Sequence, residues 1–312
     1  MRTAFVDTLT ELAGRDPRVF LVTGDIGFNL FEDFAARYPR QFLNAGVAEQ
    51  NMTGVAAGLA LAGHVVFTYS IANFPTLRCL EQIRNDVCIH GADVKIVAVG
   101  GGMAYGNLGP THHGLEDLAI LRSLPGMTVL APGDPVEAAL ATRAVAAHAG
   151  PCYLRLGKAG EPVVHRAPPD FRIGHAVRLR DGDDVALVST GGTLPLVAAA
   201  AEALARRGVE ARVLSMVTLA PLDDEALLEA ADQVGRIVTV EEHGAGGLAS
   251  AAAEVLVTHG RPVDFRSLRL PRKVIEEVGG QSHLRESHGL SVENLLRVVA
   301  AMTGTRSASV ES

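Results

Sequence analysis

The sequence contains no tryptophan, only 4% aromatic residues and three cysteines among its 312 residues. Cys79, Cys88 and Cys152 are scattered without the spacing of metal ligands, so they predict no metal site and fit a reducing cytoplasm. The net charge is −7 and no long basic run occurs, which argues against nucleic-acid partners. No apolar run is long enough to span a membrane, and the opening residues contain acids where a signal peptide needs an apolar core.

What the sequence does contain is a regular alternation of short β-branched segments with longer, alanine-rich amphipathic ones. Continuous apolar strands separated by helices are typical of a parallel sheet covered on both faces. In the first part, strands are expected at 19–24, 64–69, 94–100, 127–131 and 152–158, and helices near 2–13, 49–62, 75–90, 115–124 and 134–148. Further on, strands are expected at 184–190, 211–217, 236–242 and 263–270, and helices near 194–207, 223–233, 246–258 and 291–302.

This pattern predicts an α/β protein with two doubly wound parallel-sheet domains. The first predicted domain covers residues 1–158. Residues 159–174 are rich in glycine and proline and lack periodicity, so they are expected to form a linker. The second predicted domain covers residues 175–304, and the small, polar residues 305–312 are expected to be a disordered tail.

The most informative segment reads NAGVAEQNMTGVAAGLALAG and places Glu49 at the start of an expected helix. Residues 52–62 of this helix carry no charge. The small residues Gly54, Ala57 and Gly58 would let another element pack closely against it. An acid at such a place can also serve only to stabilise the helix N-terminus through the helix dipole.

The phrase GVAEQNMTGVAAGLA, residues 46–60, resembles the pyrimidine-binding domain of the transketolase family of thiamine diphosphate enzymes. The resemblance implies that Glu49 is catalytic and hydrogen-bonds the ring nitrogen of the cofactor's aminopyrimidine. By sharing a proton with that nitrogen, its carboxyl group would favour the imino tautomer, which then removes the thiazolium proton. Aspartate would fall short of this contact, and glutamine could not supply the proton.

The segment FTYSIANFPTLRCLEQIRNDV, residues 67–87, is similar to the strand and helix that flank the aminopyrimidine in this family. The resemblance implies cofactor binding by Phe74, Ile71 and Arg78. Phe74 falls where the family stacks an aromatic side chain on the ring, whereas Ile71 replaces an earlier aromatic residue. Taken alone, a phenylalanine at a helix start belongs to the hydrophobic core more often than to a cofactor site.

The phrase GPTHHGLED, residues 109–117, is close to a family loop that carries a substrate-contacting histidine. The resemblance implies that His112 is this residue, with a catalytic role, and that His113 is a more variable neighbour that can also contact substrate. Histidine suits such a loop because it can donate to a carbonyl or hydroxyl group and titrates near neutrality. Two adjacent histidines can also lie on an exposed turn without any function.

The family often holds a substrate phosphate with a basic side chain at the end of the strand that reads CYLRLGK. Arg155 and Lys158 match such positions, and Arg122 in the phrase LRSLPGM is a third candidate. Arginine offers a planar fork to a phosphate, while lysine offers a point charge. Solvation at the surface is the alternative for all three residues.

Some family features are missing. In transketolases proper an aspartate precedes the GPTH phrase and a second sugar-binding histidine ends the preceding strand, whereas this chain has Leu108 and Gly100. The sugar specificity is therefore not implied. The GDG phrase and downstream asparagine that hold the metal and diphosphate are also missing, because GDIGFN at Gly24 lacks the second glycine in register. The resemblance thus implies a partner subunit that carries this GDG…N domain and holds Mg²⁺ or Ca²⁺ in an α2β2 assembly.

The leading hypothesis is the smaller subunit of a two-component transketolase, which transfers a two-carbon ketol unit from a ketose, expected to be phosphorylated, to an aldehyde. The enzyme alternatives are the beta subunit of a 2-oxo acid dehydrogenase decarboxylating component and a deoxyxylulose-phosphate synthase-like enzyme. A non-catalytic subunit is a third possibility, against which Glu49 argues. A dinucleotide-binding protein is a fourth, since HGAGGLA matches G-x-G-x-x-A at Gly244, Gly246 and Ala249. That phrase follows the third strand of its domain, however, and the fingerprint belongs after the first.

Overall fold

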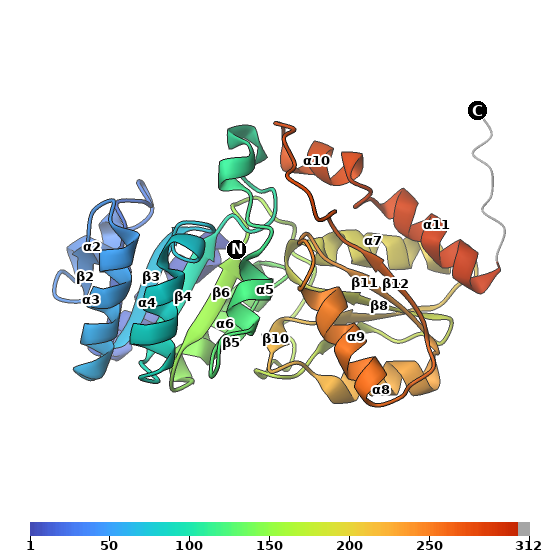
Figure 1. Cartoon of the computed structure of the whole chain (residues 1–312), viewed down its shortest axis with the longest axis horizontal. Coiled ribbons are helices and arrows are strands. Elements are labelled where there is room, and N and C mark those ends of the chain that lie inside the picture. The colour runs from blue at the N-terminus through green and yellow to red at the C-terminus, as the bar shows by residue number, and fades with distance from the viewer. Residues whose placement is uncertain (305–312) are drawn as a thin grey trace.

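The computed structural model describes residues 1–304 and folds them into two mainly parallel sheets flanked by helices (Figure 1). The first sheet has the strand order β10-β5-β6-β4-β3-β1-β2. Its strands are β1 Val19–Thr23, β2 Phe42–Asn44, β3 Val65–Ile71, β4 Val94–Val99, β5 Thr128–Leu130, β6 Cys152–Leu156 and β10 Thr218–Ala220. The second sheet has the order β12-β11-β8-β9-β7. Its strands are β7 Val177–Arg180, β8 Val185–Ser189, β9 Ala211–Ser215, β11 Arg236–Val240 and β12 Asp264–Leu268.

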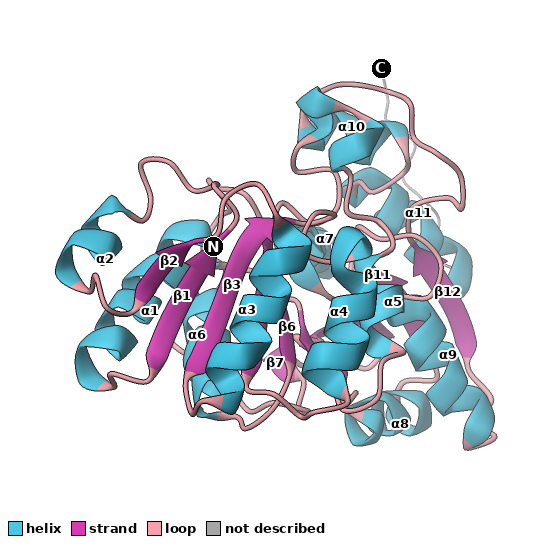
Figure 2. Cartoon of the chain, turned by 60° about the vertical axis from the view of Figure 1, so that its left-hand side comes forward, coloured by secondary structure: helices cyan, strands magenta, loops and turns pink. Residues whose placement is uncertain are grey.

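Helices pack on either side of both sheets. Each sheet together with its helices forms one unit, and the first unit contains the sheet that includes β1. In this first unit α1 and α6 pack together on one face of the sheet, while α3 and α4 lie on the other (Figure 2). The helices are α1 Arg2–Arg15, α2 Glu32–Arg37, α3 Glu49–Leu61, α4 Leu80–Gln82, α5 Asp117–Arg122, α6 Pro135–Ala147, α7 Leu194–Ala205, α8 Asp224–Gln233, α9 Leu248–Thr258, α10 Gln281–Ser287 and α11 Val292–Thr303. None of the helices in residues 1–304 is long and apolar enough to cross a membrane.

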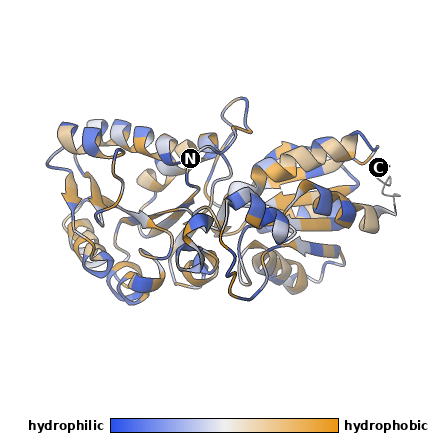
Figure 3. Cartoon of the chain, turned by 90° about the horizontal axis from the view of Figure 1, so that it is seen from above, coloured by the Kyte–Doolittle hydropathy of each residue, from blue (hydrophilic) through white to orange (hydrophobic). Residues whose placement is uncertain are grey.

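The strands form where apolar and β-branched residues predominate, although β4 includes Lys95 and β6 includes Arg155. Every residue of β4 and β6 is buried, as is all of β3 except its last residue, Ile71, because helices cover both faces of the sheet. Figure 3 shows hydrophobic residues following the strands of both sheets. Helix starts follow local chemistry as well. At α6, the Asp134 side chain accepts a hydrogen bond from the Glu137 amide, with Pro135 at the first helical position.

The predicted α/β class with two parallel-sheet units is confirmed, and the expected strands and most expected helices are present. Each sheet also has an antiparallel edge strand that was not predicted, β10 in the first and β7 in the second. Because β10 pairs with β5, a segment that follows the linker completes the first sheet. The expected helix at 75–90 is instead a 3₁₀ turn, the short α4 and a π-helical segment, Ile83–Cys88. The tail predicted for 305–312 lies outside the described residues.

Candidate active site

Glu49 is the first residue of α3, and its side chain is only 2% exposed. Gly24, directly after β1, lies against it: a Cβ added to Gly24 would be 3.4 Å from Glu49 Cγ. Arg78 Nη1 donates a hydrogen bond to Glu49 Oε2 at 2.7 Å. The other carboxylate oxygen, Oε1, accepts no hydrogen bond from residues 1–304. The site therefore contains a buried carboxyl group with one oxygen available to a further donor.

Three more of the predicted residues gather beside Glu49. The Cζ atom of Arg78 lies 4.7 Å from the ring centre of Phe74, in cation–π contact. The Phe74 and His112 rings meet edge to face, with centroids 5.4 Å apart. The structure thus connects Glu49, Arg78, Phe74 and His112 through consecutive contacts, although they come from three separate segments of chain.

The two histidines of the GPTHH phrase have different environments. His112 is half-buried on a 3₁₀ turn, where its Nδ1 lies 3.0 Å from the Thr111 hydroxyl. His113 is 3% exposed, and neither of its ring nitrogens has a hydrogen-bond partner in the described chain. Burial lowers the pKa of His113, against the opposing charge of Glu242, so this ring is held in its neutral form. Asn73 Nδ2 positions the loop by donating to the carbonyl oxygens of Thr111 and His113.

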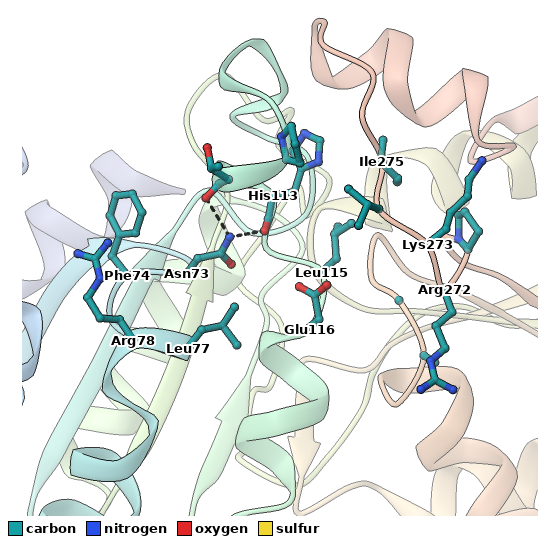
Figure 4. Close-up of a pocket in the computed structure, with 16 residues that line it drawn as sticks. Asn73, Phe74, Leu77, Arg78, His113, Leu115, Glu116, Arg272, Lys273 and Ile275 are labelled. Carbon is teal, nitrogen blue, oxygen red and sulfur yellow. Dashed lines mark hydrogen bonds between the residues drawn. The ribbon is translucent and has the colours of Figure 1, made fainter.

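A cleft of about 770 Å³ opens between the two units beside these residues. One wall contains Phe74, Arg78 and His113, and the other contains Arg272 and Lys273 from the segment that follows β12. Figure 4 shows Phe74 and Arg78 on one side of the site and Arg272 and Lys273 on the opposite side. Three of the predicted site residues thus line one concave surface, which is the usual shape of a ligand site, and Glu49 and His112 contact two of them.

The predicted phosphate-binding residues are not brought together. Arg155 is 5% exposed, donates to Asp117 Oδ2 at 2.9 Å, and also donates to the carbonyl oxygens of Gly114 and Glu242. Arg122 extends from α5 to the second unit, where it donates to the Gly246 carbonyl oxygen. Both arginines therefore join the two units.

Lys158 and Ile71 lie at the carboxyl ends of two different strands of the first sheet, β6 and β3. Lys158 is exposed just beyond β6, and its Nζ lies 4.9 Å from the ring centre of Tyr105. Ile71 is the half-buried last residue of β3. Tyr105 was not singled out by the sequence, since nothing in its local pattern shows what its ring would contact.

The outer face of α3 is the surface that the sequence predicts to be covered by another subunit. Gly54 and Gly58 are exposed, and a Cβ added to either would meet no atom within 4 Å. The apolar side chains of Val47 and Leu61, at the two ends of this face, are 75% and 63% exposed. Ala57 was expected on the same surface, but it is 3% exposed and packs in the core, because it lies on the inner side of the helix.

The glycine-rich phrase after β11 does not offer a dinucleotide site. Both carboxylate oxygens of Glu241 accept hydrogen bonds from the amides of Leu248 and Ala249 at the start of α9. These amides would be needed to bind a pyrophosphate. A Cβ on Gly246 would come within 2.6 Å of Ala119 Cβ, and its φ is +92°. Glycine at position 246 therefore permits a close approach between the two units. This packing role, together with the occupied amides of Leu248 and Ala249, opposes the dinucleotide-binding alternative.

One cluster outside the cleft has the composition of a metal site. Ligand atoms of Asp134, Glu137 and His165 all lie within 4.8 Å of one another. Each of their four carboxylate oxygens already faces a donor group: backbone amides for three of them, and His165 Nε2, at 2.8 Å, for Glu137 Oε1. These contacts attach residues 164 and 165 to the start of α6 and leave no free ligand set.

Two models of known protein families match most of the chain. Residues 1–160 match the family model "Transketolase, pyrimidine binding domain", and residues 174–295 match "Transketolase, C-terminal domain". The chain belongs to the transketolase family. It is 39% identical over 300 residues to one subunit of the apulose-4-phosphate transketolase of Phocaeicola vulgatus, covering 95% of each chain. It is 36% identical over 305 residues to the 6-deoxy-6-sulfo-D-fructose transketolase subunit SqwH of Clostridium sp. (strain MSTE9), covering 97% of this chain and 94% of that one.

A solved structure gives the same assignment. The chain superposes on a protein described as "Split gene transketolase, inactive beta4 tetramer" with a TM-score of 0.88, 35% identity and 98% coverage of both chains. The chain is thus of the smaller transketolase subunit type, in a family of thiamine diphosphate-dependent transferases whose general reaction is ketol transfer.

Proposed function

We propose that this chain is the smaller subunit of a two-component transketolase, which moves a two-carbon ketol unit from a phosphorylated ketose to an aldehyde. The observation that carries the proposal is the buried Glu49 carboxyl group, which Arg78 links to the Phe74 ring and whose Oε1 is free to meet a ligand donor. The Arg78 guanidinium group pairs with Oε2 only, so Oε1 of this buried carboxyl group has no hydrogen-bond partner within residues 1–304, which fits a ligand donor better than a purely structural role.

The residues present fit the aminopyrimidine of thiamine diphosphate. Glu49 would hold a proton between its carboxyl group and the ring nitrogen, and Phe74 would contact the face of the ring. Ile71 would complete the apolar wall around it, and Arg78 would border the bound ring after giving up its present contacts with Glu49 and Phe74. When bound, the cofactor supplies the carbon nucleophile that accepts the two-carbon unit. The role of this chain is to position the ring, exclude water and control the proton at Glu49.

The substrate would lie where His112 and His113 adjoin the cleft. Both nitrogens of the buried His113 ring lack a hydrogen-bond partner within residues 1–304, so we propose that a hydroxyl or carbonyl group of the substrate supplies one when the loop adjusts around it. Among the three basic candidates, Lys158 is the exposed one, and it makes no ion pair within residues 1–304. We therefore assign the phosphate first to Lys158, while Arg155 and Arg122 support the loops between the two units.

The partner is proposed to be a subunit with the GDG…N domain, which holds the diphosphate through Mg²⁺ or Ca²⁺. Two copies of each chain would form an α2β2 assembly in the cytosol, in which the glycine face of α3 is covered. Two observations support this arrangement: Gly54 and Gly58 have no contact that explains a missing side chain, and Val47 and Leu61 beside them are exposed. Self-association also has a precedent in the similar split-gene transketolase, which is described as a beta4 tetramer.

The test is reconstitution with the partner subunit. The chain alone should bind thiamine diphosphate weakly in calorimetry and show no turnover, whereas the mixture should transfer a ketol unit from a ketopentose phosphate to an aldehyde. Tight cofactor binding by the chain alone would contradict the two-component arrangement. Turnover of 2-oxo acids without ketol transfer would favour the dehydrogenase or synthase alternative instead.

A further inference from the structure

The ring of Tyr105 occupies the space above Gly100, directly after β4. Gly100 has a φ of +82°, and a Cβ added to it would lie 2.1 Å from Tyr105 Cε2 and 2.2 Å from Cδ2. No side chain can therefore project from position 100 while the Tyr105 ring stays where it is. The family's second sugar-binding histidine belongs at this position, so an aromatic ring from the following loop fills the volume that such a side chain would use.

The same ring also positions a charge. Lys158 Nζ lies 4.9 Å from the ring centre of Tyr105, within the range of a cation–π contact. Lys158 is exposed and makes no ion pair with any residue from 1 to 304, so its charge is available to a ligand. On the other side, Tyr105 packs on the hydrophobic core of the first unit, as Ile71 does. Tyr105 thus links an apolar wall to an uncompensated cation.

These residues lie on the edge of the sheet where a ligand is expected. Strands β6, β4 and β3 are neighbours in the first sheet, and Lys158, Gly100 and Ile71 lie at or just beyond their carboxyl ends. The next strand is β1, which is followed by Gly24 and its contact with Glu49. Ligands of open α/β sheets bind beyond the carboxyl ends of the strands. A substrate that reaches Glu49 along this edge passes the Tyr105 ring and Lys158.

We propose that Tyr105 is a specificity-determining residue for the ketose, an inference that rests on the proposed function. Its ring replaces a hydroxyl-reading side chain at position 100 and holds the Lys158 ammonium group over the phosphate of the substrate. The site therefore selects the donor more by its terminal anion than by its hydroxyl groups. Sequence similarity at the GPTHH phrase does not reveal this change, because the contact arises from how two loops fold together.

The experiment uses the enzyme reconstituted with its partner subunit and compares kcat/KM for a ketopentose 5-phosphate with kcat/KM for the unphosphorylated ketopentose. The Tyr105→Ala variant should lower this ratio by about tenfold, because Lys158 loses the surface that positions it. Gly100→Ala should move the ratio in the same direction, since its Cβ displaces the ring. Tyr105→Phe should keep the wild-type ratio, because the ring itself is retained.

Tyr38→Ala provides a matched control, since Tyr38 also lies under a cation, with Arg37 Cζ 5.5 Å from its ring centre, on another part of the first unit. This variant should keep the wild-type ratio. Turnover of both ketoses with a ratio that Tyr105→Ala and Gly100→Ala do not move would overturn the role of Tyr105. Equal loss for both substrates would also overturn it, because a purely structural residue behaves in that way. A wild-type assembly that turns over neither ketose would refute the proposed function, and this inference with it.

Discussion

The guanidinium group of Arg78 contacts both groups on which the cofactor site depends: it donates to Glu49 Oε2 at 2.7 Å and lies 4.7 Å from the ring centre of Phe74. An aminopyrimidine is also planar and would use the same carboxyl group and the same ring. We therefore expect Arg78 to move when the cofactor arrives. Its side chain is 47% exposed, so it can turn toward solvent without a large rearrangement. Until then it compensates the buried carboxylate.

The first prediction concerns Glu49→Gln. This change keeps the shape of the side chain but removes the proton that the mechanism needs, so turnover of the reconstituted enzyme should fall by roughly 10²–10⁴-fold. The thermal midpoint of the chain should change little, because glutamine can still accept a hydrogen bond from Arg78. Steady-state kinetics and thermal unfolding check the two parts. Near-native turnover in this variant would remove Glu49 from the mechanism.

The second prediction concerns the glycine face of α3. Replacing Gly58 by leucine should prevent assembly with the partner while leaving the folded chain intact, because position 58 is exposed and a Cβ added there meets no atom within 4 Å. Gly58→Ala is the control, and it should stabilise the free chain by about 0.5–1 kcal/mol through helix propensity. Light scattering of the mixture and thermal unfolding of the free chain measure these effects. An intact, active assembly with Gly58→Leu would show that this face stays in solvent.

Much of the fold could be predicted because burial and periodicity are local signals. β3 and β4 are rich in apolar and β-branched residues, and they form strands. β10 was missed because it has only three residues and its partner, β5, is distant in the sequence. The role of Arg155 also depends on a residue that is distant in the sequence. Nothing in CYLRLGK indicates a buried ion pair with Asp117, 38 positions earlier. Phe74 and Arg78 could be named from their phrase, but the contact of Arg78 with Glu49 required the fold.

The third prediction concerns His113 in the cleft. Because burial lowers its pKa, the His113 ring should stay neutral at pH values where an ordinary histidine is already protonated. Protonation of His113 should therefore lower kcat/KM only below about pH 6.5, which gives the acid limb of the pH profile. His113→Asn should lower kcat/KM by about tenfold and remove that limb. A pH profile of the reconstituted enzyme measures both effects. A limb that is unchanged in His113→Asn would assign it to another group.

The fourth prediction concerns the stability of the junction between the two units. His243 is completely buried there, with Nε2 3.6 Å from Asp117 Oδ1. Burial lowers its pKa to about 4, although the charge of Asp117 opposes this shift. In the unfolded chain the ordinary pKa near 6.5 applies, so between these values the unfolded state binds the extra proton. Stability should therefore fall as the pH is lowered from about 6.5 toward 4.

Glu241 contributes with the opposite sign. Burial raises its pKa to about 7, although hydrogen bonds from Ala249 and Leu248 work against the shift. The folded state then binds the extra proton, so the contribution of Glu241 to stability is present at low pH and is lost as the pH rises through about 7. The two residues can be separated by urea unfolding of the chain at several pH values between about 5 and 7.

In that experiment His243→Asn should reduce the loss of stability on acidification, by up to about 1.4 kcal/mol for each pH unit, because asparagine does not titrate. An asparagine amide can still donate toward the Gly244 carbonyl oxygen that faces His243 Nδ1 at 3.2 Å. Glu241→Gln should steepen the loss, since it removes the contribution that grows at low pH. The slope of stability against pH is the quantity to compare, because the variants also differ in absolute stability. Identical slopes for the wild type and His243→Asn would show that His243 binds its proton equally in the folded and unfolded states.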